Sequence, residues 1–161
     1  MTLPFAMIRQ APHDFWCFAA VTASLWRFYA QSDQLQMCEV VSRVRGEPCC
    51  PPTPNCELPA DLEQALQLFS LFERQVPSSI PFGAGVQPCI TDEIDAGRPV
   101  CLALHFGTYI HFCVVHGYQQ GSRLLAIADS LFDDQLVDYS ALLASYHEGG
   151  RWIATYFTRA L

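Results

Sequence analysis

The hydrophobic pattern of this 161-residue chain changes once, near residue 98. Apolar residues recur at helical spacing in residues 1–98, whereas residues 99–161 contain short runs rich in β-branched and aromatic residues. Helices followed by strands, without regular β-α alternation, are typical of the α+β class and not of a doubly wound sheet. The pattern predicts a single α+β domain over residues 1–161, with an N-terminal helical part packed on a C-terminal antiparallel β-sheet.

Three of the predicted helices lie early in the first part. The clearest begins after Asp14, a candidate N-cap, and covers residues 15–29. Its apolar residues share one helical face, so we expect this helix to be largely buried. Two further helices are expected over 34–44 and after Pro59, separated by a stretch rich in proline and cysteine at 48–56.

The second part is predicted to form a series of strands. Residues 100–106 and 110–116 are β-rich runs joined by a Gly-Thr-Tyr sequence at 107–109, which predicts an antiparallel hairpin. Further strands are expected at 123–128 and 151–158. The remaining expected elements are a loop over 77–88 and short helices at 91–96 and 139–146.

Composition and charge limit the partners of the chain. A hydrophobic content of 51% supplies a core and excludes intrinsic disorder. The chain has nine arginines, no lysine and sixteen carboxylates, which gives a net charge of −7. A negative surface repels nucleic acid and anionic membranes, so the charge does not favour either as a partner. The apolar stretches 15–30 and 99–118 contain Arg27 and three histidines, respectively, so neither is expected to span a membrane. The N-terminal residues do not resemble a Sec signal peptide.

The eight cysteines fall into two groups. Cys38, Cys49, Cys50 and Cys56 crowd the proline-rich stretch, whereas the other four lie in or beside apolar segments. We expect two disulfides among the first four, and Cys38 is expected to bond to Cys49 or Cys50 because these adjacent cysteines are poorly placed to bond to each other. A zinc site is the alternative, although the spacing lacks the paired Cys-x2-Cys knuckles of such sites.

Cys17 lies in the first turn of the first predicted helix. Unpaired backbone N–H groups and the helix dipole favour an anion at this position, and therefore a thiolate over a thiol. A buried structural cysteine is the alternative, since that is the commonest fate of a free cysteine on an apolar helix. Position alone does not decide between the two.

A thiolate nucleophile also needs a base, and a histidine on a β-strand is a recurrent solution. His111 and His116 lie five residues apart on one predicted strand, so at most one of their side chains is expected to face Cys17. His105, on the preceding strand, is a third candidate. Asp129 follows the next predicted strand. Its carboxylate could hold an imidazole in one tautomer, and the alternative is that Asp129 is a turn residue.

Motifs in a recognisable order run through nearly the whole chain. The sequence Trp-Cys-Phe-Ala-Ala at 16–20 surrounds the candidate nucleophile, and His-Phe through Gly-Tyr at 111–118 contains a candidate base. Between these two motifs lie a cysteine-rich insert at 38–56 and the segment 93–100. Ala-Asp-Ser follows them at 128–130. Together these stretches resemble bacterial papain-like cysteine proteases, a group related to staphopain-type enzymes and to double-glycine leader peptidases. The resemblance implies a papain-like fold.

The same resemblance implies a Cys-His-Asp catalytic triad and no cofactor or metal ion. Carried over position by position, it makes Cys17 the nucleophile, His111 the general base and acid, and Asp129 the residue that orients His111. Gln10 becomes the side-chain donor to the oxyanion, together with the backbone N–H of Cys17. The departures are that Gln10 lies seven residues before Cys17 where the group has six, and that Phe18 and Ser130 replace Trp and Pro.

The implied function is that of a cysteine endopeptidase, which hydrolyses a protein or peptide substrate through an acyl-enzyme. A papain-fold deamidase or acyltransferase is the alternative, because the same triad supports other acyl transfers. A catalytically inactive peptide-binding module is a third class, and the intact set of catalytic residue types disfavours it. We expect the domain in the bacterial cytoplasm, or delivered to another cell as a toxin or effector with a cognate immunity protein as partner.

Overall fold

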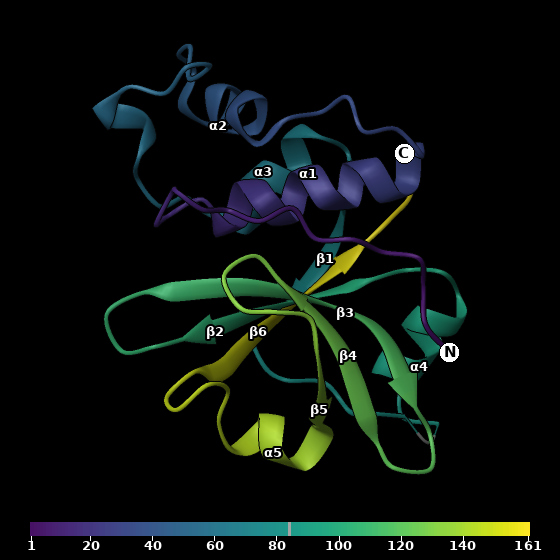
Figure 1. Ribbon diagram of the computed structural model, residues 1–161. Coiled ribbons are helices and arrows are strands. Elements are labelled where there is room, and N and C mark those ends of the chain that lie inside the picture. Colours follow the sequence, from purple (N-terminus) through teal and green to yellow (C-terminus); the bar gives the residue numbers. More distant parts are fainter. Residues whose placement is uncertain (84) are drawn as a thin grey trace.

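A six-stranded antiparallel sheet forms the middle layer of the fold (Figure 1). The computed structural model describes residues 1–83 and 85–161. The strand order is β1-β6-β2-β3-β4-β5, and every neighbouring pair is antiparallel. The strands are β1 (Phe72–Val76), β2 (Val100–His105), β3 (Ile110–Gln119), β4 (Leu124–Asp129), β5 (Gln135–Asp138) and β6 (Arg151–Thr158).

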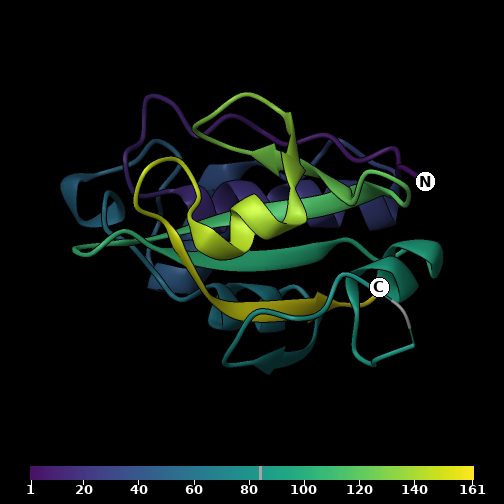
Figure 2. The same ribbon diagram turned by 90° about the horizontal axis from the view of Figure 1, so that it is seen from below.

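Helices pack on both faces of this sheet. Three helices lie together on one face, and two short ones contribute to the core on the other face (Figures 1 and 2). The first three are α1 (Cys17–Ala30), α2 (Met37–Arg45) and α3 (Leu62–Leu68), and the other two are α4 (Ile90–Asp95) and α5 (Tyr139–Ala144). A 3-10 turn at Pro54–Cys56 precedes α3. This arrangement confirms the expected α+β class, with an N-terminal helical part packed on an antiparallel sheet.

The central strands are buried on both faces, which explains why their sequences are nearly continuous apolar runs. In β2, Cys101 and Ala103 belong to the core beneath α1. Val100, Leu102 and Leu104 belong to the core that α4 and α5 cover. The alternation of side chains along one strand therefore divides a single apolar run between two cores.

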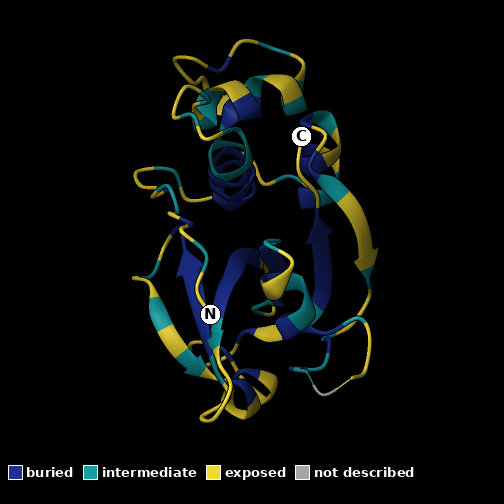
Figure 3. Ribbon diagram, turned by 90° about the vertical axis from the view of Figure 1, so that its right-hand side faces the viewer, coloured by how far each residue is buried: buried dark blue, intermediate teal, exposed yellow. Residues whose placement is uncertain are grey.

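Helix α1 packs against the sheet and against helices α2 and α3, and its first nine residues are all buried. A helix that is apolar on all sides is suited to this position. Figure 3 shows that the buried residues lie on this helix and in the middle of the sheet. In the part of the chain that the structure describes, no helix has the length and apolar character that a membrane crossing requires.

The sequence pattern missed both edge strands, β1 and β5. β1 lies in the part predicted to be helical, and it pairs with β6 far along the chain. Its middle residues Glu73, Arg74 and Gln75 are exposed and polar, as is common in edge strands, so no apolar run marks it. The loop predicted over 77–88 is irregular in the described residues, and residue 84 lies outside them.

Helix α1 begins two residues later than the sequence pattern indicates. Its N-cap residue is Trp16, whose side chain makes no capping hydrogen bond. Asp14, the predicted N-cap, instead offers its backbone carbonyl to the side-chain amide of Gln10. Cys17 is therefore the first residue of the helix.

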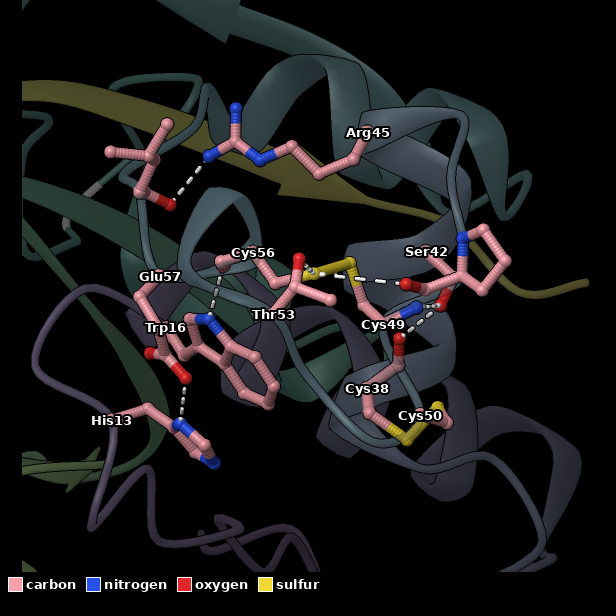
Figure 4. Close-up of a disulfide and its surroundings, with 12 residues drawn as sticks. His13, Trp16, Cys38, Ser42, Arg45, Cys49, Cys50, Thr53, Cys56 and Glu57 are labelled. Atoms are coloured by element: carbon pink, nitrogen blue, oxygen red, sulfur yellow. Dashed lines mark hydrogen bonds and ion pairs between the residues drawn. A yellow bond between two sulfur atoms is a disulfide. The ribbon is translucent and has the colours of Figure 1, made fainter.

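The four clustered cysteines form two disulfides, Cys38–Cys50 and Cys49–Cys56 (Figure 4). The pairing agrees with the expectation that Cys38 bonds to one of the two adjacent cysteines. It also occupies the four sulfur atoms that the alternative zinc site would need as ligands, so the disulfides take the place of that site. The two crosslinks join helix α2 and the 3-10 turn into one stapled segment, defined here as residues 38–57.

The buried position of α1 predicts a large loss of stability on truncation of its core side chains. Leu25 is fully buried in α1, so Leu25→Ala is expected to lower the free energy of unfolding by about 2–5 kcal/mol. Leu143 on helix α5 is 45% exposed, and Leu143→Ala is the matched control, with an expected change within about 0.5 kcal/mol. Urea denaturation followed by circular dichroism measures both. Equal losses in the two variants would contradict the assignment of α1 to the core.

Candidate active site

Cys17 lies at the N-terminus of α1 and lines a cavity of about 860 Å³. The backbone N–H groups of a helix's first turn have no partner within the helix, and together with the helix dipole they favour a negative charge there. Cys89, Cys101 and Cys113 are also free thiols, but each is fully buried and none lines this cavity. Burial raises the pKa of the Cys101 and Cys113 thiols. Cys17 is therefore the free cysteine best placed to meet a substrate.

The register of β3 and β4 brings His111 and Asp129 together. Asp129 lies opposite Cys113 in this antiparallel pair, and His111 is two residues from Cys113 on the same face of β3. The imidazole Nε2 lies 2.8 Å from the carboxylate Oδ1, and both side chains are almost fully buried. His111 also lines the cavity that contains Cys17.

Two opposing effects set the pKa of His111. Burial lowers it, but hydrogen bonds and charge interactions with Asp129 and Cys17 outweigh burial and raise the pKa of His111 to about 9. Because Nε2 is bonded to Asp129, Nδ1 is the ring nitrogen left for another partner. The raised pKa favours a charged imidazolium at neutral pH.

The carboxylate of Asp129 has partners on both oxygens. Oδ1 accepts hydrogen bonds from the backbone N–H groups of Leu131 and Phe132 in addition to the contact with His111, and Oδ2 accepts one from the hydroxyl of Tyr146 at 2.7 Å. Burial alone raises the pKa of Asp129, but the hydrogen bond and charge of His111, with the other donors, lower it below its ordinary value. Asp129 is therefore a carboxylate held ionised inside the protein.

Sequence reasoning missed Tyr146 and Arg9. Tyr146 follows α5 and is 2% exposed, and its hydroxyl lies between Asp129 and the side-chain amide of Gln135. The guanidinium of Arg9 donates to the backbone carbonyls of Asp129, Leu131 and Phe132, and so fixes the loop after β4. No local motif marks either residue, because both act through contacts with a distant segment.

The other two histidine candidates lie elsewhere. Nδ1 of His116 lies 3.3 Å from the carbonyl of Leu3, and its ring packs near Phe5 in the N-terminal segment. His105 lines the same cavity as Cys17, but its Nδ1 accepts a hydrogen bond from the backbone N–H of Gly107. Of the three, His111 is the one that carries a carboxylate partner.

Gln10, the predicted oxyanion donor, is fully buried and already bonded within the protein. Its amide nitrogen donates to the carbonyls of His13 and Asp14, and its amide oxygen accepts from the hydroxyl of Ser130. These bonds tie the segment before α1 to the residue that follows Asp129. Donation to a substrate oxygen would require Gln10 to give up one of the two carbonyls, so its oxyanion role stays a prediction.

The stapled segment contacts the residues directly before Cys17 (Figure 4). The indole N–H of Trp16 donates to the carbonyl of Cys56 at 2.8 Å, and His13 lies 2.8 Å from the carboxylate of Glu57. The rings of His13 and Trp16 stack with their centroids 3.6 Å apart. The disulfide-bonded loop thus supports the N-terminus of α1 from the side away from the sheet.

One family profile matches the chain. The Peptidase_C39 like family matches residues 81–159, just under half of the sequence. That range contains His111 and Asp129 but not Cys17. No curated protein matches the chain.

Three solved structures are similar to the chain over nearly its whole length. The peptidase domain of Streptococcus ComA, a bifunctional ABC transporter involved in a quorum sensing pathway, is 14% identical with a TM-score of 0.60, and the match covers 98% of this chain and 99% of that one. The fold is that of C39 peptidases. A protein from Bacillus anthracis described as a C39-like peptidase is 14% identical with a TM-score of 0.59, covering 99% of this chain and 98% of that one.

The third structure is a double glycine motif protease from an AMS/PCAT transporter in complex with the leader peptide. It is 16% identical with a TM-score of 0.55, and the match covers 99% of this chain and 94% of that one. These similarities confirm the papain-like fold class expected from the motifs. The relation to staphopain-type enzymes stays a prediction.

The contact of Tyr146 with Asp129 predicts a specific electrostatic effect within this C39 peptidase fold. Tyr146→Phe removes the donor to Oδ2, so the pKa of Asp129 is expected to rise, as measured by NMR titration of its carboxyl carbon. Tyr139 is the matched control, since its buried hydroxyl donates to the carbonyl of Ile80 instead.

Each variant should lose about 1–3 kcal/mol of stability, because each leaves a buried acceptor unpaired. The Tyr139→Phe variant should leave the pKa of Asp129 unchanged. An unchanged titration in Tyr146→Phe would show that Tyr146 does not set the charge of Asp129.

Proposed function

We propose that this protein is a papain-like cysteine endopeptidase that acts through Cys17, His111 and Asp129. The observation that carries the proposal is that Cys17 at the start of α1 and His111 line the same cavity, with the His111 imidazole 2.8 Å from the buried carboxylate of Asp129. The match of residues 81–159 to the Peptidase_C39 like family supports it, because that range contains both the base and its orienting partner. The leader-peptide complex of a structural neighbour supports a peptide substrate.

The reaction begins with attack of the Cys17 thiolate on a scissile carbonyl. His111 then protonates the leaving amine from Nδ1, which yields an acyl-enzyme and the C-terminal fragment. His111 next takes a proton from water, and the resulting attack on the thioester releases the N-terminal fragment and restores the thiol. Asp129 holds the ring orientation and stabilises the imidazolium throughout.

The oxyanion of each tetrahedral intermediate needs donors near the sulfur. The backbone N–H of Cys17 is at the unpaired start of α1 and supplies one of them. Gln10 supplies the second only if its amide turns away from His13 or Asp14. The anchoring bonds of Gln10 therefore mark it as the part of the site that has to move when substrate binds.

Deamidation and transfer to another nucleophile use the same acyl-enzyme and differ only in the amide attacked or the final acceptor. No contact in the described residues favours them over hydrolysis. Delivery to another cell as a toxin, and an immunity protein that covers the cavity at Cys17, stay predictions from composition.

Loss of the nucleophile is expected to abolish turnover. Cys17→Ala should reduce the formation of new N-termini in a bacterial lysate to the background of a sample without protein, because it removes the sulfur that forms the acyl-enzyme in the proposed mechanism. Cys101→Ala is the matched control, since it removes a free but fully buried thiol and should retain activity. Mass spectrometry of labelled N-termini measures both.

New N-termini with Cys17→Ala equal to those with the unmodified protein would rule out the mechanism. A change in substrate mass without new N-termini would support deamidation instead.

The raised pKa of His111 predicts the alkaline limit of activity. His111 must be protonated to donate to the leaving amine, so kcat/KM should fall as the pH rises through about 9. Asp129→Asn keeps the shape of the side chain but removes the charge that holds the proton on His111. The alkaline limb should therefore move to lower pH, as measured by peptide hydrolysis between pH 5 and pH 10. An unmoved limb would contradict the coupling of Asp129 to His111.

A further inference from the structure

Exposed apolar side chains gather around the cavity at Cys17. Phe15, Tyr109, Ile110 and Leu131 all line it, and each is between 41% and 48% exposed. They come from the residue two before α1, the end of the turn between β2 and β3 with the first residue of β3, and the loop after β4. Side chains from three separate segments thus form one apolar wall, and such patches on a protein surface mark sites of interaction.

Two carboxylates, those of Asp14 and Asp61, lie on the same cavity. Asp61 is the N-cap of α3, and its Oδ1 accepts from the backbone N–H of Glu63 at 3.1 Å. Asp14 is held through its backbone carbonyl by Gln10. Both residues are exposed, and among the described residues neither forms an ion pair.

Arginine side chains lie elsewhere on the molecule, and the imidazolium of His111 on this cavity is already paired with Asp129. No arginine is among the described residues that line the cavity at Cys17, and the chain has no lysine. Four of the nine arginines, Arg27, Arg74, Arg98 and Arg159, instead line a separate cavity near the C-terminal end of α1. The field of Asp61 also reaches Tyr156 on the cavity wall, where burial first and then Asp61 raise the pKa of the phenol to about 12.

We propose that this cleft selects peptides that carry an apolar side chain at the scissile bond and an arginine or lysine within a few residues of it. The apolar part packs on the wall formed by Phe15, Tyr109, Ile110 and Leu131, and the cation pairs with Asp14 or Asp61. The inference rests on the proposed peptidase function and specifies its substrate class.

The expected size of the preference follows from the exposure of these carboxylates. Exposed ion pairs contribute about 0.2–1 kcal/mol each, so one pair corresponds to a difference in kcat/KM of about 1.4- to 5-fold between cationic and anionic peptides, and two pairs to about 2- to 30-fold. Salt screens exposed charges, and the preference is therefore expected to shrink in 0.5 M NaCl, an ionic strength well above the physiological value of about 0.15 M.

A randomised library of ten-residue peptides tests this selection. Mass spectrometry of the cleaved products gives the frequency of Arg and Lys relative to Asp and Glu within four residues of each cut. The unmodified protein should enrich the cations several-fold, and the Asp14→Asn/Asp61→Asn variant should lose most of this enrichment. Asn is also a good N-cap, so α3 is expected to persist in the variant.

Asp138→Asn is the matched control. Asp138 is also an exposed N-cap, of helix α5, and it does not line the cavity. This variant should keep the full preference for cationic peptides.

Cleavage without charge preference, or a preference that survives in the double variant, would overturn the selection while leaving the peptidase function intact. Absence of cleavage of every peptide by the unmodified protein would reject the proposed function and the selection together.

Discussion

The site is organised around the buried pair of Asp129 and His111. An ionised carboxylate inside a protein is strongly unfavourable unless hydrogen bonds and an opposite charge compensate it. Here three donors on Oδ1 and the hydroxyl of Tyr146 on Oδ2 provide that compensation. The same contacts fix the orientation of the imidazole of His111, which lines one cavity together with Cys17.

The two sides of the site are supported by different parts of the chain. On the sheet side, the register of β3 and β4 sets the position of His111, and Arg9 fixes the loop that follows Asp129. On the helix side, the buried first nine residues of α1 set the position of Cys17, and Trp16 joins the N-terminus of α1 to the disulfide-bonded loop through Cys56. The stapled segment therefore supports the N-terminus of α1, where Cys17 lies.

Much of the fold could be predicted because its signals are local. Periodicity indicated α1, the hairpin of β2 and β3, and β4, since each has an apolar run or face that is evident within a few residues. The edge strands β1 and β5 escaped prediction because they bury little, and Glu73 to Gln75 have the composition of a loop. The start of α1 was misplaced by two residues, since Asp14 has the chemistry of an N-cap but uses its carbonyl for Gln10.

The sequence by itself determined the order of helices and strands, the crowding of four cysteines in one loop, and the presence of a thiol, imidazoles and a carboxylate in a familiar order. Only the tertiary structure decided that His111 rather than His116 has a carboxylate partner, that Cys38 bonds to Cys50, and that Tyr146 and Arg9 secure Asp129. The physical reason is the sequence separation over which each kind of interaction acts. Periodicity and helix capping act over a few residues, whereas these contacts depend on how distant segments pack and on which strand register buries both faces of the sheet.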